Sequence, residues 1–247
     1  MDVALVTVGD ELLAGDTANT NATWLCRRLT DRGVTVTRVL TVPDNRAVIA
    51  DAVRSFSQAF DAVVVTGGLG GTPDDVTKAA VADALDRDLV VDEGVREGVV
   101  AKAEAYAEQY PDLADAYDLD VDFDAQASIP ENARPLVTSE SFGPGFVAAN
   151  VYAFPGIPDE LHVMFELVEA EFDGGVVSES LYTPAPEGAL NDRLEAVRER
   201  FDVAVGSYPG KGRTPTRLKL SGEPADVDRA LDWLRERVDV TEPPAEG

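Results

Sequence analysis

The chain has 247 residues, and 45% of them are hydrophobic, which is enough for a packed core. Charge is its unusual property, because 21 basic and 46 acidic residues give a formal net charge of −25 at pH 7. A surface of this sign repels nucleic acids and anionic membranes, so we expect neither as a partner. The acidic residues are spread along the whole chain and do not form a tail, so we interpret them as a halophilic adaptation to molar salt and not as a binding surface.

Cysteine usage and the N-terminal residues indicate the compartment. Cys26 is the only cysteine, so no intramolecular disulfide can form and a reducing cytoplasm is the natural location. The N-terminus carries no basic, apolar signal segment, and no apolar run approaches the roughly 20 residues that span a bilayer. We therefore expect a cytoplasmic protein, and we do not expect Cys26 to act as a nucleophile.

The first part of the chain alternates between apolar strands and amphipathic helices. Residues 3–9 form an apolar run that ends in glycine, and residues 21–33 place apolar side chains on one helical face. An alternating strand at 34–40, an amphipathic helix at 45–60 and a short apolar strand at 61–68 follow. Val-rich strands separated by such helices are typical of a parallel sheet that helices cover on both faces. The sequence thus predicts an α/β core.

The middle of the chain extends this core less regularly. We expect a helix at 75–86, a brief strand at 89–91, a helix near 93–109, a solvated acidic segment at 111–126 and a strand at 135–137.

A small module is expected after Gly174 and Gly175, a pair that marks a domain boundary. Its predicted pattern is strand, helix, strand, strand and helix, at 176–183, 188–200, 202–207, 216–221 and 224–237. That order is typical of half of a ferredoxin-like or KH-like sandwich.

Polar, Gly-rich segments fall at the carboxyl ends of the predicted strands, where open parallel sheets bind ligands. Four of them are expected to converge there, at residues 9–21, 43–45, 67–75 and 155–161. Glycines let the backbone approach a ligand, and the unpaired N–H groups at a helix N-terminus attract anions such as phosphate. The loop GGLGGTP fits neither the Rossmann nor the Walker spacing, so we predict a phosphate cradle of another kind.

Two aspartates at the predicted start of the third helix have two competing interpretations. With Thr72 as the N-cap, Pro73, Asp74 and Asp75 fill the first helical positions, where both charges favour the helix dipole. Asp44 has the same ambiguity, because it precedes the second helix. The alternative is chemical, because carboxylates beside a phosphate cradle need a divalent cation between like charges. The acids expected at this edge of the sheet are Asp10, Glu11, Asp44, Asp74 and Asp75.

Several motifs occur in the order found in CinA-like proteins: GDELLAGDTANTNATWL, VPDN, TGGLGGTPDDVTKAAVA, GPGF and FPGIPDELHVMF. Over about residues 2–170 the chain resembles the first domain of that family, which has the three-layer αβα MoaB/Mog molybdopterin-binding fold. We therefore expect a MoaB/Mog-like domain at 1–172 and a small KH-like α+β module at 176–240. Bacterial CinA proteins often continue into a deamidase domain, whereas this chain ends at Gly247, so no deamidase activity is carried over.

The resemblance implies a small phosphate-bearing ligand and roles for individual residues. In Mog-type relatives the Gly-rich loop cradles the pterin phosphate, and two aspartates that match Asp44 and Asp75 are implicated in catalysis. In CinA-like members the same pocket is associated with metal-dependent hydrolysis of ADP-ribose and similar pyrophosphates. Asp44 and Asp75 would then hold a divalent metal (Mg, Mn or Co) or orient the attacking water. The other ligand-binding residues are expected to be Gly9, Asp10, Glu11, Asn21, Gly67, Gly68, Gly70, Gly71, Thr72, Pro155 and Gly156.

The predicted function is metal-dependent hydrolysis of a nucleotide pyrophosphate such as ADP-ribose. Two alternatives stay open: a molybdopterin adenylyltransferase of cofactor biosynthesis, and a non-catalytic molybdopterin or nucleotide binder. We expect valine at Gly70 to abolish ligand binding, because it would block the cradle and resist the φ angles that glycine permits.

Three further features are expected to lie outside the chemistry. His162 and Trp24 are expected to pack against their neighbours. The loop at 210–212 lacks the spacing with which KH folds clamp nucleotides, so the C-terminal module is expected to serve interaction or homo-oligomerisation.

Overall fold

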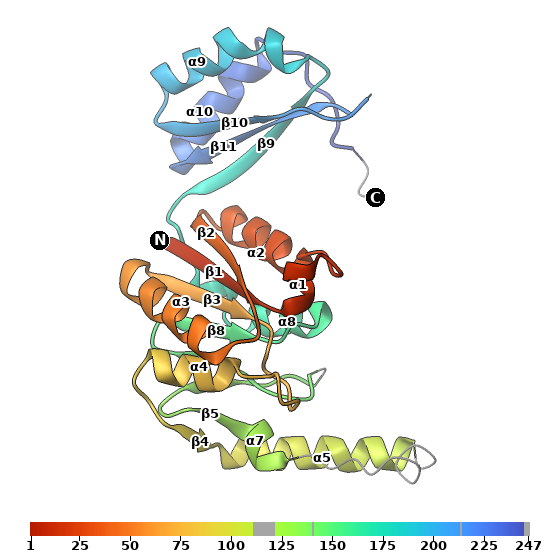
Figure 1. Cartoon of the computed structure of the whole chain (residues 1–247). Helices are drawn as coiled ribbons and strands as arrows, with labels where there is room; N and C mark the ends of the chain where they lie inside the picture. Colours follow the sequence, from red (N-terminus) through yellow and green to blue (C-terminus); the bar gives the residue numbers. More distant parts are fainter. Residues whose placement is uncertain (111–121, 140, 213, 245–247) are drawn as a thin grey trace. The chain divides into compact units, whose positions relative to one another are not determined.

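The computed structural model describes residues 1–110, 122–139, 141–212 and 214–244 (Figure 1). The chain divides into two compact units. The larger unit consists of Asp2–Cys26 and Val36–Glu171, and the smaller unit consists of Met1, Arg27–Thr35 and the chain from Phe172 onward. Among the helices that the described residues form, none is long and apolar enough to cross a membrane.

A six-stranded sheet organises the larger unit, in the order β2-β1-β3-β8-β7-β6. β3 lies between β1 and β8 and runs parallel to both, whereas β7 pairs antiparallel with β8 and β6 antiparallel with β7. β3 is buried at every position, as expected for a central strand with both faces covered. The strands are β1 (Asp2–Val8), β2 (Thr35–Val42), β3 (Ala62–Thr66), β6 (Arg134–Leu136), β7 (Gly145–Ala148) and β8 (Val151–Phe154).

Helices cover both faces of this sheet. On one face, α3 (Arg46–Ala59) and α4 (Thr77–Ala84) share a core with alternate residues of the strands. On the other face, Phe154 of β8 contacts Phe165 of α8 (Pro158–Glu166), with ring centroids 6.0 Å apart, and Trp24 of α2 (Thr20–Asp31) packs edge-on against the same phenylalanine. The predicted three-layer α/β fold with a mostly parallel sheet is confirmed.

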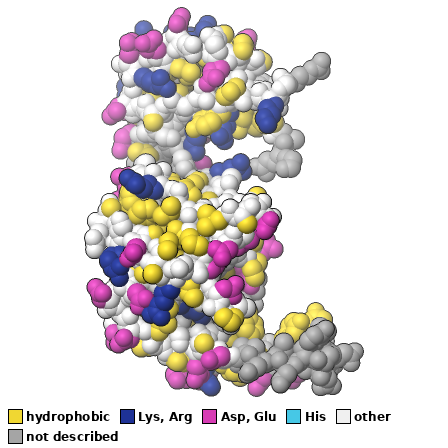
Figure 2. Space-filling model, in the orientation of Figure 1, with side chains coloured by type: hydrophobic (Ala, Val, Ile, Leu, Met, Phe, Trp, Pro, Cys, Tyr) yellow, Lys and Arg dark blue, Asp and Glu magenta, His cyan; other side chains and the backbone are white. Residues whose placement is uncertain are grey.

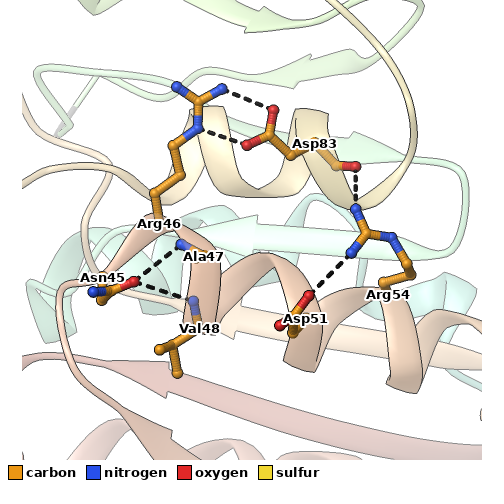
Figure 3. Close-up of polar contacts among 7 residues, drawn as sticks. All are labelled: Asn45, Arg46, Ala47, Val48, Asp51, Arg54 and Asp83. Carbon is orange, nitrogen blue, oxygen red and sulfur yellow. Dashed lines mark hydrogen bonds and ion pairs between the residues drawn. The ribbon is translucent and has the colours of Figure 1, made fainter.

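Polar contacts join α3 to α4 at the surface (Figure 3). Nε and Nη2 of Arg46 donate to the two carboxylate oxygens of Asp83 at 2.6 and 2.7 Å. Nη2 of Arg54 donates to the backbone carbonyl of Asp83 at 2.6 Å. These contacts support the buried packing that holds α4, and the Gly-rich loop before it, against α3.

A small satellite structure follows α4. β4 (Leu89–Val91) pairs antiparallel with β5 (Ser128–Pro130), and α5 (Glu93–Gln109) packs against α7 (Phe123–Ala127).

α7 corrects one expectation, because it lies in the acidic segment that we expected to be solvated. Asp122 caps this helix by accepting the N–H of Ala125 at 2.9 Å, and Gln126 and Ala127 then turn inward and are buried. The expectation of a solvated segment is therefore wrong at Gln126, while residues 111–121 lie outside the described residues.

The smaller unit contains a three-stranded antiparallel sheet, in the order β10-β11-β9. Leu194 and Leu231 of its helices share a core with Leu218 and Leu220 of the central strand. The predicted order of strand, helix, strand, strand and helix is confirmed, with β9 (Val177–Thr183), α9 (Asn191–Arg200), β10 (Val203–Tyr208), β11 (Thr216–Gly222) and α10 (Pro224–Arg235).

Candidate ligand-binding site

The Gly-rich loop that follows β3 bends where glycine is needed. Gly67 and Gly68 have φ angles of +94° and +67°, which side chains disfavour. A Cβ atom at Gly67 would lie 2.4 Å from the carbonyl oxygen of Val8, and one at Gly68 would lie 2.4 Å from Oγ1 of Thr77. The close packing of this loop on β1 and α4 therefore depends on both glycines.

Successive backbone N–H groups of this loop, those of residues 68–71, donate no hydrogen bond to any other described residue. The flanking N–H groups are occupied: that of Gly67 donates to the carbonyl of Phe154 at 3.1 Å, and that of Thr72 donates to Oδ2 of Asp75 at 2.9 Å. Consecutive unpaired N–H groups form a concave donor surface that binds anions. The donors available for a phosphate are therefore those of residues 68–71, not those of Gly67 and Thr72.

Asp74 and Asp75 form a turn ahead of α4 and do not cap the helix. The Thr72 hydroxyl lies 2.5 Å from Oδ1 of Asp74 and 2.6 Å from Oδ2 of Asp75, and this hydrogen bonding lowers the pKa of Asp74. α4 begins only at Thr77, after Val76, and no side chain caps it. The prediction of a helix from residue 75 with Thr72 as N-cap is wrong, because the turn from Thr72 to Asp75 closes before the helix begins.

A cavity of about 530 Å³ lies beside this loop, a size typical of small-molecule sites. It brings together the predicted catalytic residue Asp75 and several of the predicted ligand-binding residues, namely Gly68, Gly70, Gly71, Thr72, Pro155 and Gly156. The rest of its wall was not predicted and consists of Leu69, Asp122, Gln126, Phe142, Gly143, Ile157 and Glu160.

Among the described residues of this wall, the charged side chains are all acidic, namely Asp75, Asp122 and Glu160. Burial raises the pKa of the Glu160 carboxyl, while the backbone N–H of Phe142 and the charge of Lys102 act in the opposite direction. Within the described ranges, no group of three or more His, Cys, Asp or Glu side chains is arranged to hold a metal ion. A cation would need ligands from the bound molecule as well as from the protein, as Mg²⁺ commonly has.

A smaller cavity of about 100 Å³ lies beside the predicted segment at residues 9–21. Of the predicted site residues, Glu11 and Asn21 of this segment line it together with Gly67 and Gly156, and Gly156 also lines the larger cavity. Nδ2 of Asn21 donates to the carbonyl of Gly156 at 2.7 Å. The two cavities therefore share a wall that Asn21 supports.

The side chain of Asp44, which lies in the chain between β2 and α3, contacts the start of α1 (Asp10–Ala14), a short helix that was not predicted. Oδ2 of Asp44 accepts the N–H of Asp10 at 2.8 Å. The cap of α3 is the next residue, Asn45, whose Oδ1 accepts two backbone N–H groups of the first turn (Figure 3). Asp44 thus does not cap α3 and instead accepts the first N–H of α1, and Gly9, Asp10 and Asp44 do not line either of these two cavities.

Lys78 is a buried charge beside the site. It is 5% exposed, and its Nζ donates to the backbone carbonyls of Ala125 and Gln126 at 3.0 and 3.1 Å, which attaches α7 to α4. Burial lowers the pKa of Lys78 to about 8, although the charge of Asp75 opposes this shift. A lysine inside the apolar run TKAAVA is a signal that sequence reasoning could have used, whereas Gln126 lies in an acidic segment and gives no such signal.

His162 packs, as predicted. Its ring stacks on the indole of Trp24, with centroids 4.0 Å apart and an interplanar angle of 21°. Burial raises the pKa of the Cys26 thiol, which disfavours the nucleophilic thiolate.

Comparison with known proteins gives matches to both parts of the chain. A family model described as "Probable molybdopterin binding domain" matches residues 4–172, and one described as "FAD synthase, middle domain" matches residues 175–242. A protein of Archaeoglobus fulgidus is 34% identical over 239 residues, which cover 96% of this chain and 97% of the relative. A CinA-like protein of Thermotoga neapolitana is 32% identical over 95% of this chain and 57% of its own length.

One solved structure is similar to this chain in sequence to about the same degree as these relatives. The crystal structure of the protein CinA with unknown function from Thermoplasma acidophilum is 30% identical and aligns with a TM-score of 0.59. The alignment covers 69% of this chain and 97% of that one.

Proposed function

Because the chain belongs to the CinA-like proteins with a molybdopterin-binding domain of the MoaB/Mog type, we propose that it hydrolyses a nucleotide pyrophosphate such as ADP-ribose. The observation that carries this proposal is the run of unpaired N–H groups at residues 68–71 beside a cavity wall whose charged side chains are acidic. The N–H groups suit phosphate, and the acids need a divalent cation before an anion can approach them. The two features together fit a pyrophosphate that carries its own metal ion.

The phosphate-binding role belongs to the loop backbone. In the proposed complex, the N–H groups of residues 68–71 donate to phosphate oxygens and stabilise the charge that grows on them in the transition state. Asn21 and Glu11, around the smaller cavity, contact the part of the ligand that extends beyond the loop. Asp10 is proposed to contribute to the same contact.

The acid side chains supply the catalytic groups. Oδ2 of Asp75 is bound by Thr72, but Oδ1 accepts no hydrogen bond from the described residues and is available to a cation or a water molecule. Asp44, which does not cap α3, is proposed as the second carboxylate. A bound Mg, Mn or Co ion would neutralise phosphate charge and increase the acidity of the attacking water.

The proposed reaction is a simple displacement at phosphorus. Water adds to one phosphorus, and the bond between that phosphorus and the bridging oxygen breaks. The carboxylate of Asp75 orients the water, and ADP-ribose yields AMP and ribose 5-phosphate. FAD is a second substrate of the same class, because the family model over residues 175–242 is named for FAD synthase and FAD also contains a pyrophosphate joined to adenosine.

Turnover assays of the full chain in molar KCl test this proposal. ADP-ribose, FAD, and ATP with molybdopterin are each incubated with Mg²⁺, Mn²⁺, Co²⁺ or EDTA, and products are separated by chromatography. Metal-dependent release of AMP from ADP-ribose or FAD supports the proposal. Formation of an adenylylated pterin with release of pyrophosphate would replace it by the adenylyltransferase alternative, and binding without any turnover would replace it by a non-catalytic binder.

A further inference from the structure

Gln126 on α7 is buried and nevertheless has an unused carboxamide. It lines the larger cavity and is 5% exposed, but its side chain makes no hydrogen bond with any described residue. Neither polar atom of the carboxamide is fully enclosed, so the group is open to the cavity and can hydrogen-bond to a molecule bound there. We propose that the Gln126 carboxamide binds the edge of a flat nitrogen heterocycle, in the first place adenine, and so determines which base the site accepts. The inference rests on the proposed function in taking a nucleotide as the ligand.

The position of the carboxamide places it beside the phosphate donors. A Cβ atom built on Gly71 would lie 2.8 Å from Oε1 of Gln126, and one built on Gly143 would lie 2.3 Å from Nε2. The carboxamide therefore lies against the backbone of the Gly-rich loop on one side and against the turn before β7 on the other. A ligand whose phosphate is bound at residues 68–71 can thus reach the carboxamide with its base.

The backbone that carries the carboxamide is held in place. Nζ of Lys78 donates to the Gln126 carbonyl at 3.1 Å, and the next residue, Ala127, is buried in the core that joins α5 to α7. A carboxamide on a fixed backbone is pre-organised, so little ordering is needed when a ligand binds.

The rest of the wall suits a flat ring. Phe142 and Ile157 line the cavity with large apolar side chains that are 38% and 58% exposed, and a bound heterocycle would cover them. A carboxamide offers a donor beside an acceptor, which matches the amino group and the neighbouring ring nitrogen N7 of adenine. At this edge hypoxanthine has a carbonyl oxygen beside N7, which makes two acceptors, so one of the two hydrogen bonds is lost in either orientation of the carboxamide. Pterin also presents an amino group next to a ring nitrogen.

Binding measurements that do not depend on hydrolysis test the inference. Titration calorimetry in molar KCl with Mg²⁺ gives the affinities of AMP, IMP and pterin for the parent chain and for Gln126→Met. The parent is expected to prefer AMP to IMP by about tenfold or more, as for a bidentate amide contact, and Gln126→Met is expected to bring this ratio close to one. The ratio cancels effects on the phosphate, which both nucleotides share.

Two further variants make the outcome unambiguous. Gln58→Met, on the exposed side of α3, is the matched control and should keep the parent ratio. Gln126→Leu is of similar size and also removes both the donor and the acceptor, so it replaces Gln126→Met if the latter does not fold, and it should also lose the preference. If Gln126→Met weakens pterin binding and leaves the ratio of AMP to IMP affinity unchanged, Gln126 binds a pterin and the assignment to adenine is wrong.

An unchanged AMP to IMP ratio together with unchanged pterin affinity in both Gln126 variants would overturn the inference. That failure is separate from failure of the proposed function. If the chain hydrolyses ADP-ribose but the Gln126 substitutions leave the AMP to IMP affinity ratio unchanged, the proposed function stands and the inference about Gln126 is wrong. If the Gln126 substitutions abolish the preference for AMP but the chain hydrolyses no pyrophosphate, the inference stands and the proposed function is wrong.

Discussion

Asp74 and Asp75 are neighbours in the chain, but only Asp75 lines the cavity. Asp75→Asn keeps the shape of the side chain and removes the charge that a cation needs. We expect ADP-ribose turnover to fall by about 100-fold or more, with little change in melting temperature because Asp75 does not cap α4. Asp74→Asn, at an exposed position, is the matched control and should be much milder. If Asp75→Asn hydrolyses ADP-ribose as fast as the parent, the catalytic assignment of Asp75 is wrong.

Asp44→Asn tests the second carboxylate separately. Asp44 accepts the Asp10 N–H but does not line the larger cavity, so its proposed role depends on a ligand or cation that extends toward α1. We expect turnover to fall as strongly as in Asp75→Asn, and the half-saturating metal concentration to rise. A variant with normal turnover and normal metal dependence would restrict Asp44 to holding the start of α1.

Lys78 makes stability depend on pH in a predictable direction. Its pKa is about 8 in the folded chain and has an ordinary value of 10.5, so between these values the unfolded chain binds a proton that the folded chain has released. The free energy of unfolding should therefore rise with pH in this window, by up to about 3 kcal/mol, relative to a variant without the amine. Urea unfolding of the parent and of Lys78→Met at pH 7 and pH 10, in constant KCl, measures this difference.

The comparison is made between the two chains because other groups titrate in the same range and cancel in the difference. Below pH 8 both states hold the Lys78 proton, so the difference between parent and variant should be flat there. A difference that is also constant from pH 8 to 10 would show that Lys78 is not perturbed as described.

The Gly-rich loop as an element gives a prediction at Gly70. Unlike Gly67 and Gly68, Gly70 does not have a positive φ angle, so the expectation that valine would be excluded there by φ is wrong. The reason is contact, because a Cβ at Gly70 would lie 2.4 Å from Oδ2 of Asp75. We expect Gly70→Val to displace Asp75 and to abolish AMP binding.

Calorimetric titration with AMP measures that loss. Gly188→Val is the matched control, because Gly188 lies in the smaller unit and a Cβ there meets no atom within 4 Å. Unchanged AMP affinity in a folded Gly70→Val chain would argue against the loop as the phosphate cradle.

Helices and strands of the central layers could be predicted because their apolar pattern follows directly from burial. Val-rich β3 is buried throughout, and the predicted helix at 45–60 corresponds to α3 with its buried face. Short elements were missed for a physical reason. α1 spans only Asp10–Ala14 and buries no residue, so its sequence has no apolar periodicity, and α7 depends on contacts with α4 and α5 that lie far away in the chain.

The candidate site could also be predicted only in part, namely where its residues follow one another in the chain. Its glycines and acids cluster directly after a buried strand, which is a local signal in the sequence. Gln126, Phe142 and Glu160 come from segments that only tertiary packing brings to the loop, so no local pattern could have placed them there. Likewise, only the hydrogen-bond pattern of the folded loop shows which of its N–H groups are free.

At the scale of the whole molecule, the net charge of −25 dominates. Figure 2 shows acidic side chains scattered over both units and interspersed with Lys and Arg, without a single acidic face in this view. At about 1 M salt the Debye length is only about 3 Å, so repulsion between these charges is screened, and at millimolar salt it is not. We expect the melting temperature to fall continuously as KCl is lowered from molar to millimolar concentration.

Ionic strength is the controlling variable in that prediction. NaCl at the same ionic strength should restore the melting temperature as KCl does, since screening does not depend on which monovalent cation is present. A melting temperature that stays flat over the whole range would refute the interpretation of the acidic composition as a halophilic adaptation.

The two tryptophans of the chain fall one to each compact unit, Trp24 to the larger and Trp233 to the smaller. Trp24 stacks on an imidazole, whereas Trp233 lies under the guanidinium groups of Arg200 and Arg237. Indole emission depends on such neighbours, so the two rings report different surroundings. Replacing either ring by phenylalanine leaves a chain whose tryptophan emission, excited at a wavelength that tyrosine does not absorb, follows one unit only. The order in which the two units lose their structure can therefore be recorded optically, without an added label.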